Sequence, residues 1–361
     1  MAHTIGIFSE GCWSDLETAS LCRRSKMAIC GLLGAMLLAV SMAASASQAD
    51  WGKFKQRFVT QEGRVIDAAQ DNISHSEGQG YGMLLAVYYD DKASFDRILQ
   101  WTKKNLQVRD DRLLAWRWDP QGGVTDKNNA SDGDLLVAWS LLRAFNKWHD
   151  PQYRLASQGI AQDIRTKMLK QAPQGLVMLP GSQGYDHPEG ITINLSYWVF
   201  PALDEIGQVD PSPQWAELAK TGMTILGYAR FGRWGLPPDW LVLTKIVAPS
   251  PHFPTRFSYN AVRIPLYLLW SRRESPALLK PYQDFWSYFQ GAKFLPSWTN
   301  LEENSVDTYD ASVGIHKLAQ WVIGYPRLPD ARKYPLDDNQ GYYSSVLLLL
   351  SDMAIKERGP K

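Results

Sequence analysis

The sequence predicts an all-α protein in which consecutive helical hairpins close into a double ring. Three observations support this fold class. Apolar residues recur at a spacing of three and four from Trp51 to the C-terminus, as in amphipathic helices. The stretches between them are rich in Pro, Gly, Asn and Asp, which favour turns. The sequence has no βαβ rhythm, no glycine-rich phosphate loop and no low-complexity linker. Long loops at one end of such a ring would form a groove there.

The individual helices follow from the same periodicity. The clearest is 132–148, where the apolar residues share one face and Asp132 and Asp134 supply the acidic start that suits a helix. The predicted helices run near 51–58, 76–90, 93–106, 132–148, 151–171, 192–206, 213–229, 259–273, 276–289, 308–323 and 340–356. Loops are predicted at 119–130, 172–190, 230–258 and 324–339, and 176–179 is expected to form a minor strand.

Residues 1–49 are interpreted as an N-terminal extension and secretory signal peptide. Arg23, Arg24 and Lys26 precede an apolar run at 27–40, and small residues with cleavage motifs at 44–46 and 47–49 follow. The apolar run is too short to span a bilayer comfortably. We therefore predict a secreted protein, located in the periplasm, with residues 50–361 as one domain and no stable membrane insertion after cleavage. The alternatives are a retained anchor and translation from Met27.

Composition narrows the class of function. All three cysteines (Cys12, Cys22 and Cys30) lie in the leader, so the mature chain has no thiol, disulfide or cysteine metal site. The formal net charge of +1 gives no electrostatic reason to bind nucleic acid. The 15 Trp and 16 Tyr residues suit stacking on sugar rings, although most of them are expected in the core.

A stretch around Glu77 is the first candidate site. Glu77 is followed by three glycines at alternate positions, a tyrosine and an apolar run. Each glycine at the start of a helix lowers helix stability by about 1 kcal/mol relative to alanine. Glycine is nevertheless favoured where another group approaches the backbone closely. With Ser74 or Ser76 as the cap, Glu77 would lie in the first turn, at the rim of a cavity. The alternative is that Glu77 only complements the helix dipole.

The second candidate site is the helix start at 131–134. Asp132 and Asp134 bracket Gly133, and neighbouring positions on a helix diverge by about 100°. The two carboxylates therefore cannot share one role. We expect one to point into the cavity while the other caps or braces the helix, and the alternative is that both are caps.

The two stretches Ser76-Glu77-Gly78-Gln79-Gly80-Tyr81-Gly82-Met83 and Ala130-Ser131-Asp132-Gly133-Asp134 together resemble glycoside hydrolase family 8. The resemblance is to the periplasmic endo-β-1,4-glucanases, or cellulases, encoded with bacterial cellulose synthases. Supporting stretches lie at 61–67, 194–197, 236–240, 256–259 and 261–265, so the resemblance extends over essentially the whole mature chain. It implies an (α/α)6 barrel, a toroid of helical hairpins with a few short strands in loops, and a groove across one end. It also implies endo-acting hydrolysis of β-1,4-glucan with inversion.

By this resemblance Glu77 is the proton donor and Asp132 lies at the subsite next to the scissile bond; because the aspartate that usually serves as base is missing here, Asp132 is our candidate base or nucleophile. Inverting hydrolysis pairs a protonated carboxyl with a second group about 6.5–9.5 Å away that deprotonates the attacking water. An apolar, aromatic surround would raise the pKa of Glu77 and keep it protonated. This chemistry requires no metal and no cofactor. The residues expected to hold sugar are Tyr81, Trp116, Asp134, Tyr197, Tyr259, Asn260 and Arg263.

Two of these residues have a rival interpretation. Arg263 is expected to hold a carboxylate or a sugar hydroxyl, and the alternative is a structural salt bridge. Asp134 is an alternative partner for Arg263 or for a loop amide. His75, beside Glu77, suggests a proton shuttle, but a lone histidine is more often structural.

The sequence departs from the family pattern at Asn260. Many members place the general base at an aspartate in a Ser-Tyr-Asp-Ala motif, whereas this chain has Ser258-Tyr259-Asn260-Ala261. A neutral amide cannot accept the proton and can only orient the water. Three explanations stay open. Asp132 takes over as the base, or turnover is weak and the protein mainly grips glucan, or a loop carboxylate reaches in, with Asp186, Glu189 and Asp239 as candidates.

The expected function is that of an endoglucanase associated with bacterial cellulose biosynthesis. Its partners would be a β-1,4-glucan chain and, as a further candidate, the cellulose synthase complex. One rival is a weakly active glucan-binding or editing protein of that complex. Another keeps the fold but acts on chitosan, xylan or mixed-linkage glucan. The near-neutral charge weakens the chitosan alternative, because ammonium groups favour an acidic groove.

Overall fold

The computed structural model describes residues 48–329 and 334–359. The predicted leader therefore lies outside the described residues, apart from its last two positions. The chain divides into two units between Asp50 and Trp51, and the helices and strands of the fold belong to the unit Trp51–Lys361. Among the described residues, no helix combines the length and the apolar composition needed to cross a bilayer.

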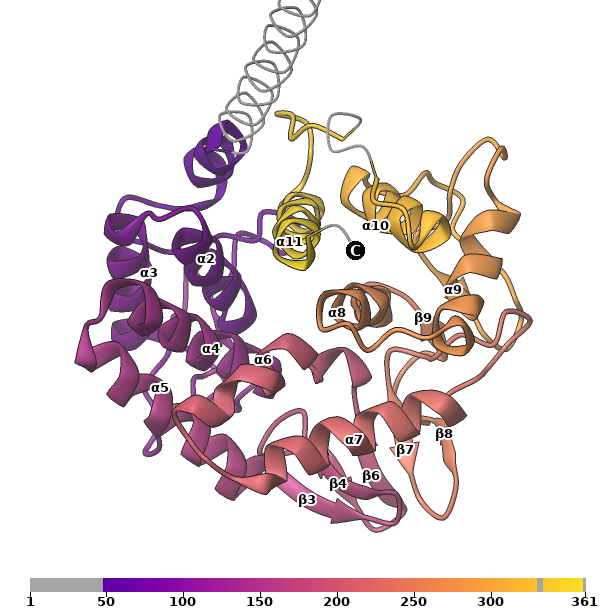
Figure 1. The fold of residues 1–361 in the computed structure, drawn as a ribbon. Helices are drawn as coiled ribbons and strands as arrows, with labels where there is room; N and C mark the ends of the chain where they lie inside the picture. The colour runs from indigo at the N-terminus through magenta and orange to yellow at the C-terminus, as the bar shows by residue number, and fades with distance from the viewer. Residues whose placement is uncertain (1–47, 330–333, 360–361) are drawn as a thin grey trace, which may run out of the picture. The chain divides into compact units, whose positions relative to one another are not determined.

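Helices form the body of this unit and follow one another around a ring (Figure 1). After a helical segment at 51–58 they are α2 (Ser76–Tyr88), α3 (Lys92–Asn105), α4 (Ser131–Trp148), α5 (Pro151–Asp163), α6 (Phe200–Glu205), α7 (Pro213–Tyr228), α8 (Ile264–Trp270), α9 (Pro276–Tyr288), α10 (Val313–Gly324) and α11 (Tyr342–Arg358). Single 3-10 or π turns occur at η1 (Ile164–Met168), η2 (Leu195–Tyr197), η3 (Ile206–Gln208) and η4 (Ala261–Arg263). The last helix, α11, contacts both α8 and α2, and this contact closes the ring.

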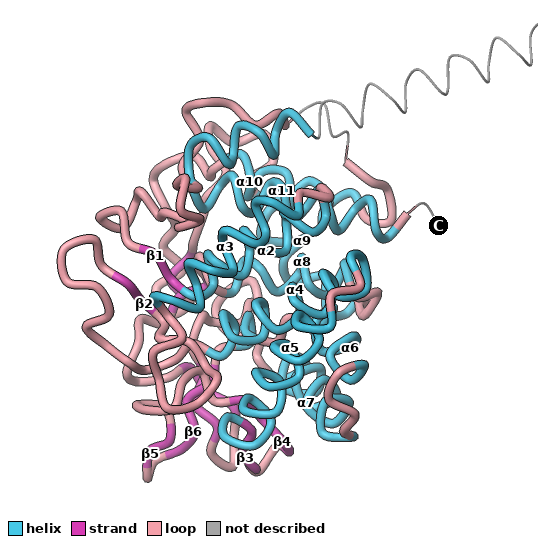
Figure 2. Tube along the Cα trace, turned by 90° about the vertical axis from the view of Figure 1, so that its left-hand side faces the viewer, coloured by secondary structure: helices cyan, strands magenta, loops and turns pink. Residues whose placement is uncertain are grey.

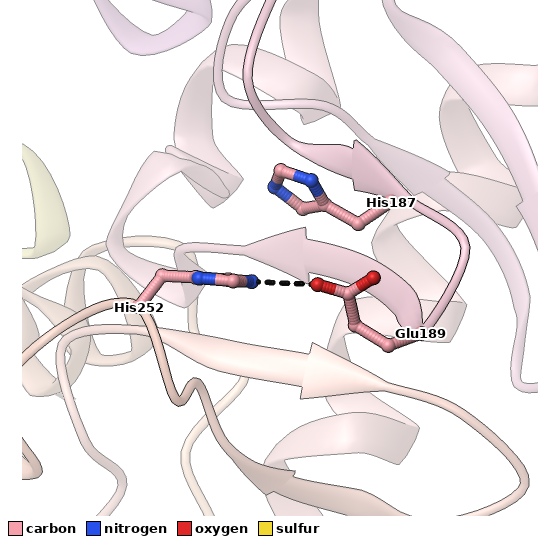
Figure 3. Close-up of side chains that lie close together, drawn as sticks. All are labelled: His187, Glu189 and His252. Carbon is pink, nitrogen blue, oxygen red and sulfur yellow. Dashed lines mark hydrogen bonds and ion pairs between the residues drawn. The ribbon is translucent and has the colours of Figure 1, made fainter.

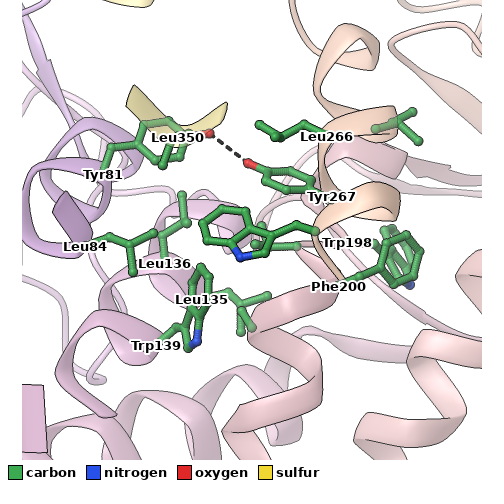
Figure 4. Packing of buried hydrophobic residues seen from close by; sticks show 14 of the residues in the cluster. Tyr81, Leu84, Leu135, Leu136, Trp139, Trp198, Phe200, Leu266, Tyr267 and Leu350 are labelled. Atoms are coloured by element: carbon green, nitrogen blue, oxygen red, sulfur yellow. Dashed lines mark hydrogen bonds between the residues drawn. The ribbon is translucent and has the colours of Figure 1, made fainter. Parts of the chain in front are cut away.

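The core lies inside the ring, between the helices α2, α4, α6, α8 and α11. These helices contact one another in succession, and α2, α4, α8 and α11 are buried along most of their length. Figure 4 shows Trp139 of α4, Tyr267 of α8 and Leu350 of α11 in this packing. Each fully buried large side chain contributes about 1.5–3 kcal/mol relative to exposure. The interior is therefore filled by side chains, and a site can form only at an end of the ring.

Three of the other helices begin with the same local motif, a capping side chain followed by a proline. Asp150, Ser212 and Ser275 each accept a backbone N–H from the first turn, and a proline occupies the first helical position. The cap satisfies an amide that has no partner in the helix, and proline has no N–H to lose there. The starts of α5, α7 and α9 are therefore set locally by the sequence.

The strands are short and lie in the connections. They are β1 (Ser74–His75), β2 (Arg117–Trp118), β3 (Leu169–Ala172), β4 (Gly175–Met178), β5 (Asp186–His187), β6 (Gly190–Ile193), β7 (Leu241–Leu243), β8 (Val247–Pro249), β9 (Arg256–Phe257) and β10 (Thr299–Asn300). They pair antiparallel as β1–β2, β3–β4, β9–β10 and a sheet of order β5-β6-β7-β8. Figure 2 shows β1, β2, β5 and β6 on the loop-rich side of the helices.

The predicted class is confirmed: helical hairpins form a ring, and the few short strands lie in loops. The predicted strand at 176–179 is β4. Three predicted helices are shorter than expected, and a fourth, 308–323, begins only at Val313. The segment 151–171 ends its α-helix at Asp163 and continues as η1 and β3; 192–206 contains β6 and η2 before α6; and 259–273 keeps only α8 after η4. In the second case Asn194 accepts the Ser196 N–H at 3.0 Å, and such local bonds compete with the helix.

Candidate active site

Glu77 lies in the first turn of α2, directly after β1, at the loop-rich end of the ring. His75 caps this helix, because its Nδ1 accepts the Gly78 N–H at 2.9 Å. The predicted caps, Ser74 and Ser76, are therefore wrong. Since the His75 Nδ1 is occupied by this hydrogen bond, the ring cannot pass a proton from that nitrogen to Glu77. The structure assigns His75 a structural role.

Two glycines let α4 approach α2 closely. A Cβ added to Gly133 would lie 2.7 Å from the Glu77 nitrogen, and a Cβ added to Gly80 would lie 2.6 Å from the Leu136 Cβ. Real Cβ contacts this short do not occur, so both positions require glycine. The glycine-rich stretch thus serves close approach, as predicted, and the partner is a second helix. The contact brings the start of α4, with Asp132, beside the start of α2.

Arg263 joins the two carboxylates. It ends η4, directly before α8, and its Nη1 contacts Glu77 Oε1 while its Nη2 lies 3.9 Å from Asp132 Oδ2. The same Nη2 donates to Ser196 Oγ and to Asn260 Oδ1, each at 3.0 Å. The Arg263 side chain is only 4% exposed. Because Arg263 Nη1 contacts Glu77 and Nη2 of the same guanidinium lies 3.9 Å from Asp132 Oδ2, the two carboxyl groups lie within the upper limit of about 9.5 Å that inverting glycosidases use.

Tyr81 supports Glu77 from the core side. Its hydroxyl donates to Glu77 Oε1 at 3.1 Å, accepts from Arg263 Nη1 at 3.2 Å and lies 3.0 Å from the hydroxyl of Tyr267 (Figure 4). With 2% exposure, Tyr81 has no ring face to offer a sugar. This placement contradicts the expectation that Tyr81 holds substrate. Its hydroxyl positions the carboxyl group of Glu77.

The surroundings of Glu77 are charged and polar, so the expected apolar surround is wrong. An adjacent guanidinium stabilises an ionised carboxylate, and the Glu77 side chain remains 20% exposed. Both Tyr81 and Arg263 engage Oε1. The other oxygen, Oε2, lies 3.9 Å from His75 Nδ1, which is already used as the helix cap. Oε2 is therefore the oxygen of Glu77 that Arg263 and Tyr81 leave open.

Asp132 is buried, and its burial raises the pKa of this carboxyl to about 7. Its side chain is 5% exposed, and Oδ1 accepts the Gly133 N–H at 2.8 Å. Oδ2 is the oxygen that faces Arg263. A carboxylate with a pKa near neutrality is a stronger proton acceptor than an ordinary one, which suits a general base.

Asp134 faces away from this cluster and braces two other segments. Its Oδ1 accepts the Leu114 N–H and its Oδ2 accepts from Asn129 Nδ2, both at 2.8 Å, and its side chain is fully buried. Burial raises the pKa of Asp134 to about 7 as well. The predicted division of roles within the pair thus agrees with the geometry, whereas the expected contact between Asp134 and sugar does not.

Three aromatic candidates keep accessible ring surface. Tyr259 is 49% exposed, while Trp116 and Tyr197 are partly buried. Trp116 Nε1 donates to Asp126 Oδ2 at 2.8 Å, and the Tyr197 ring stands edge-on to Trp240 with centroids 6.0 Å apart. These rings stay candidates for stacking on sugar, together with the partly exposed amide of Asn260.

The three loop carboxylates considered as alternative bases already have other partners. Asp186 is paired with Lys170, and Glu189 Oε1 lies 3.0 Å from His252 Nε2. Asp239 is buried, and its Oδ1 accepts the N–H groups of Ser258 and Ala261 at 3.0 and 2.8 Å. Asp239 therefore fixes the loop that carries Asn260, whereas Asp132 faces the same arginine as Glu77.

Sequence reasoning missed several residues that complete the cluster. Ser196 holds Arg263 and Tyr267 holds Tyr81 through the hydrogen bonds of their hydroxyl groups. It also missed a stack in which Trp240 lies between Tyr185 and Phe253, with centroid distances of 5.7 and 4.2 Å. Ser196 and Trp240 lie in stretches that support the family resemblance, so the motifs contained a signal for them. Tyr267 carries no such signal, because it is one of 16 tyrosines in the chain and lies on an apolar helix.

Comparison with known proteins agrees with this geometry. The model of glycosyl hydrolases family 8 matches residues 27–357. A probable endoglucanase of Novacetimonas hansenii is 37% identical over 313 residues, which cover 85% of this chain and 90% of that protein. An endoglucanase of Cellulomonas uda is 35% identical and covers 78% of this chain and 79% of its own length.

Solved structures give the same result. The endo-β-1,4-glucanase CMCax from Acetobacter xylinum superposes with a TM-score of 0.81 at 36% identity, covering 87% of this chain and 99% of that one. Endoglucanase Cel10 from Klebsiella pneumoniae, a family 8 glycosyl hydrolase, has a TM-score of 0.80 at 35% identity and covers 86% of this chain and all of its own. The expected (α/α)6 barrel is thereby confirmed. Family model, relatives and structures agree over most of the chain, which therefore belongs to glycosyl hydrolase family 8.

Proposed function

We propose that this glycoside hydrolase cleaves internal β-1,4-glucosidic bonds of cellulose-type glucan with inversion. The observation that carries the proposal is the pair Glu77 and Asp132, held on the buried guanidinium of Arg263. The relatives named endoglucanase, which cover most of this chain, support the choice of polymer.

Glu77 is the proposed general acid. Its Oε2 donates the proton to the glycosidic oxygen as the bond from that oxygen to the anomeric carbon breaks, and the residue is left as a carboxylate. Arg263 and Tyr81 already point donors at Oε1, so the negative charge that develops on Glu77 meets groups that need no reorganisation. The polar surround thus favours the product of the proton transfer.

Asp132 is the proposed general base. A water molecule attacks the anomeric carbon from the face opposite the leaving oxygen, and Asp132 Oδ2 accepts the proton that this water loses. The raised pKa of Asp132, about 7, makes it a stronger acceptor than an ordinary aspartate. Asn260 cannot replace it, because its Oδ1 already accepts from Arg263 and its amide nitrogen only donates.

The proposal is tested with cello-oligosaccharides of defined length. The expected products are shorter oligosaccharides from internal cleavage, and proton NMR at early times should show the α-anomer at the new reducing end. Products with the β-anomer would contradict inversion. Saturable binding of the oligosaccharides without new reducing ends would instead support the rival, a glucan-binding protein. Faster hydrolysis of chitosan, xylan or mixed-linkage glucan would change the assigned polymer.

We further propose that the chain is exported to the periplasm and acts beside the cellulose synthase. The basic, apolar and small-residue order of residues 23–49 supports export. Cell fractionation and sequencing of the mature N-terminus test this proposal, and a protein retained in the cytoplasm would contradict it. Co-purification with the synthase tests the proposed partner.

A further inference from the structure

Two histidines and a glutamate lie close together on segments next to the strands β5, β6 and β8, outside the cluster of Glu77, Asp132 and Arg263 (Figure 3). His187 ends β5, Glu189 belongs to the turn between β5 and β6, and His252 follows β8. Each side chain offers one ligand atom, and these atoms all lie within 4.8 Å of one another. His252 Nε2 lies 3.0 Å from Glu189 Oε1, and the two imidazole rings have centroids 4.7 Å apart.

We propose that His187, Glu189 and His252 bind one divalent transition-metal cation of the Zn²⁺ type. Imidazole nitrogens and one carboxylate oxygen are ligands that Zn²⁺ takes at about 2.0–2.2 Å. Harder cations such as Ca²⁺ and Mg²⁺ prefer sites made of oxygen. The Glu189 and His252 side chains are 51% and 42% exposed, so they are free to close around the cation and leave coordination positions to water.

His187 already has the second hydrogen bond that metal-bound imidazoles typically make. Its Nε2 lies 2.9 Å from the Gly184 carbonyl. A carbonyl only accepts, so Nε2 carries the hydrogen and the neutral ring keeps its lone pair on Nδ1. Such a bond fixes the tautomer and strengthens the metal ligand. Binding also requires His252 to give up any proton that Nε2 shares with Glu189, so a proton is released.

The backbone around the three ligands is held in place. His187 pairs with Gly190 across a two-residue turn formed by Pro188 and Glu189, and proline restricts that turn. On the other side, Ser250 N–H donates to the Trp240 carbonyl at 3.0 Å. The sheet β5-β6-β7-β8 connects the two segments, so the backbone holds the three side chains close to one another.

The cation would join the two segments that carry the outer rings of the aromatic stack. Tyr185 directly precedes β5, Phe253 directly follows His252, and both rings stack on Trp240. Binding of the cation should therefore make the stack of Tyr185, Trp240 and Phe253 more rigid. The cation takes no part in the proton transfers.

The test uses untagged full-length mature protein treated with chelator and then titrated with ZnCl₂ by calorimetry. We expect one Zn²⁺ per chain with an affinity in the micromolar range, and no comparable binding of Mg²⁺ or Ca²⁺. His187→Ala, His252→Ala and Glu189→Gln should each weaken binding by about tenfold or more. The melting temperature should rise with Zn²⁺ in the wild type, because the cation binds the folded state, and this shift should be lost in the variants.

His149→Asn is the matched control, since His149 is an exposed histidine outside the cluster and Asn tolerates its left-handed backbone, φ 60°. This variant should bind Zn²⁺ as the wild type does. Absence of saturable binding by the wild type, or equal binding by all three cluster variants, would overturn the proposal. The readout is independent of hydrolysis, so it stands or falls separately from the proposed enzymatic function.

Discussion

The helix α4 has a carboxylate–arginine cluster at each end, and the two clusters differ in how fully their hydrogen bonds are satisfied. At its C-terminal end, Arg143 makes four bonds of 2.6 to 3.2 Å to Glu205 and Glu357, and its guanidinium lies 4.3 Å from the Trp139 ring centroid. At its N-terminal end, Asp132 faces Arg263 across 3.9 Å. About 16 Å of helix separates the two clusters.

The same residue types therefore serve two purposes. The Arg143 cluster is saturated, because two carboxylates take its donors in direct contacts, and it stabilises the packing of α4 with α6 and α11. In the Arg263 cluster, Arg263 Nε is buried without a hydrogen-bond partner within the described residues, and Asp132 stays outside direct contact. Groups that lack a full set of partners can still bind a water molecule or a sugar hydroxyl. This difference supports the proposal that the Arg263 cluster is the catalytic one.

Glu77→Gln should give the largest effect, because an amide has no acidic proton to donate. We expect the release of reducing ends from carboxymethylcellulose to fall by about 10³-fold or more, while the variant stays folded at the assay temperature. The same substitution in the other cluster, Glu205→Gln, is the matched control for activity. Turnover near that of the wild type in Glu77→Gln would refute its role as the acid.

Asp132→Asn should separate activity from stability. Loss of the base should lower the rate by at least about 10²-fold. The folded-state pKa of Asp132, about 7, lies above its ordinary value, so between about pH 4 and 7 the folded state keeps a proton that the unfolded state has released. Stability therefore falls as the pH rises through this window. The variant escapes this cost and should be more stable than the wild type at pH 8, by up to about 4 kcal/mol, but not at pH 4. Urea unfolding at both pH values measures this difference, and a constant difference would contradict the raised pKa.

Glu205→Gln should affect stability and leave catalysis intact. The carboxylate of Glu205 accepts from Arg143 and, at 2.8 Å, from Trp139 Nε1. Its removal should lower the free energy of unfolding by about 1–3 kcal/mol. The catalytic rate should stay within about twofold at a temperature where both proteins are folded. A large loss of rate would show that the two ends of α4 are coupled.

Asn260→Asp should have the smallest effect on rate and a clear effect on the pH profile. The new carboxylate would lie beside Arg263 and be ionised at lower pH than the buried Asp132. If Asp132 is the base, the wild-type rate should fall as the pH drops through about 7. In the variant this decline should move to lower pH, with a rate within about tenfold of the wild type. Complete loss of activity would show that the Asn260 amide has a positive role.

Local patterns allowed part of the site to be predicted. The motif around Glu77 and the aspartate pair at the start of α4 pointed to Glu77 and Asp132, which the structure brings to the same arginine, and to different roles for the two aspartates. The same patterns misplaced the cap of α2 and predicted apolar surroundings for Glu77. Those features depend on Arg263 and Tyr81, which reach Glu77 only after the ring closes. The cluster of His187, Glu189 and His252 could not be predicted from the sequence either. His252 is far from the other two residues in the chain, and only the sheet β5-β6-β7-β8 brings it close to them.

The sequence by itself determined the helical class and the starts of helices after Asp150, Ser212 and Ser275, because caps, prolines and periodicity act over a few residues. It also indicated the family, through the resemblance of the motifs at 76–83 and 130–134. Tertiary structure alone decided which residues share a site. One arginine lies between carboxylates from α2 and α4, Tyr81 is withdrawn into the core, and Asp239 is used to fix a loop. Burial and charge arise from segments far apart in the chain, so a pKa or a free hydrogen-bonding oxygen exists only once those segments have packed.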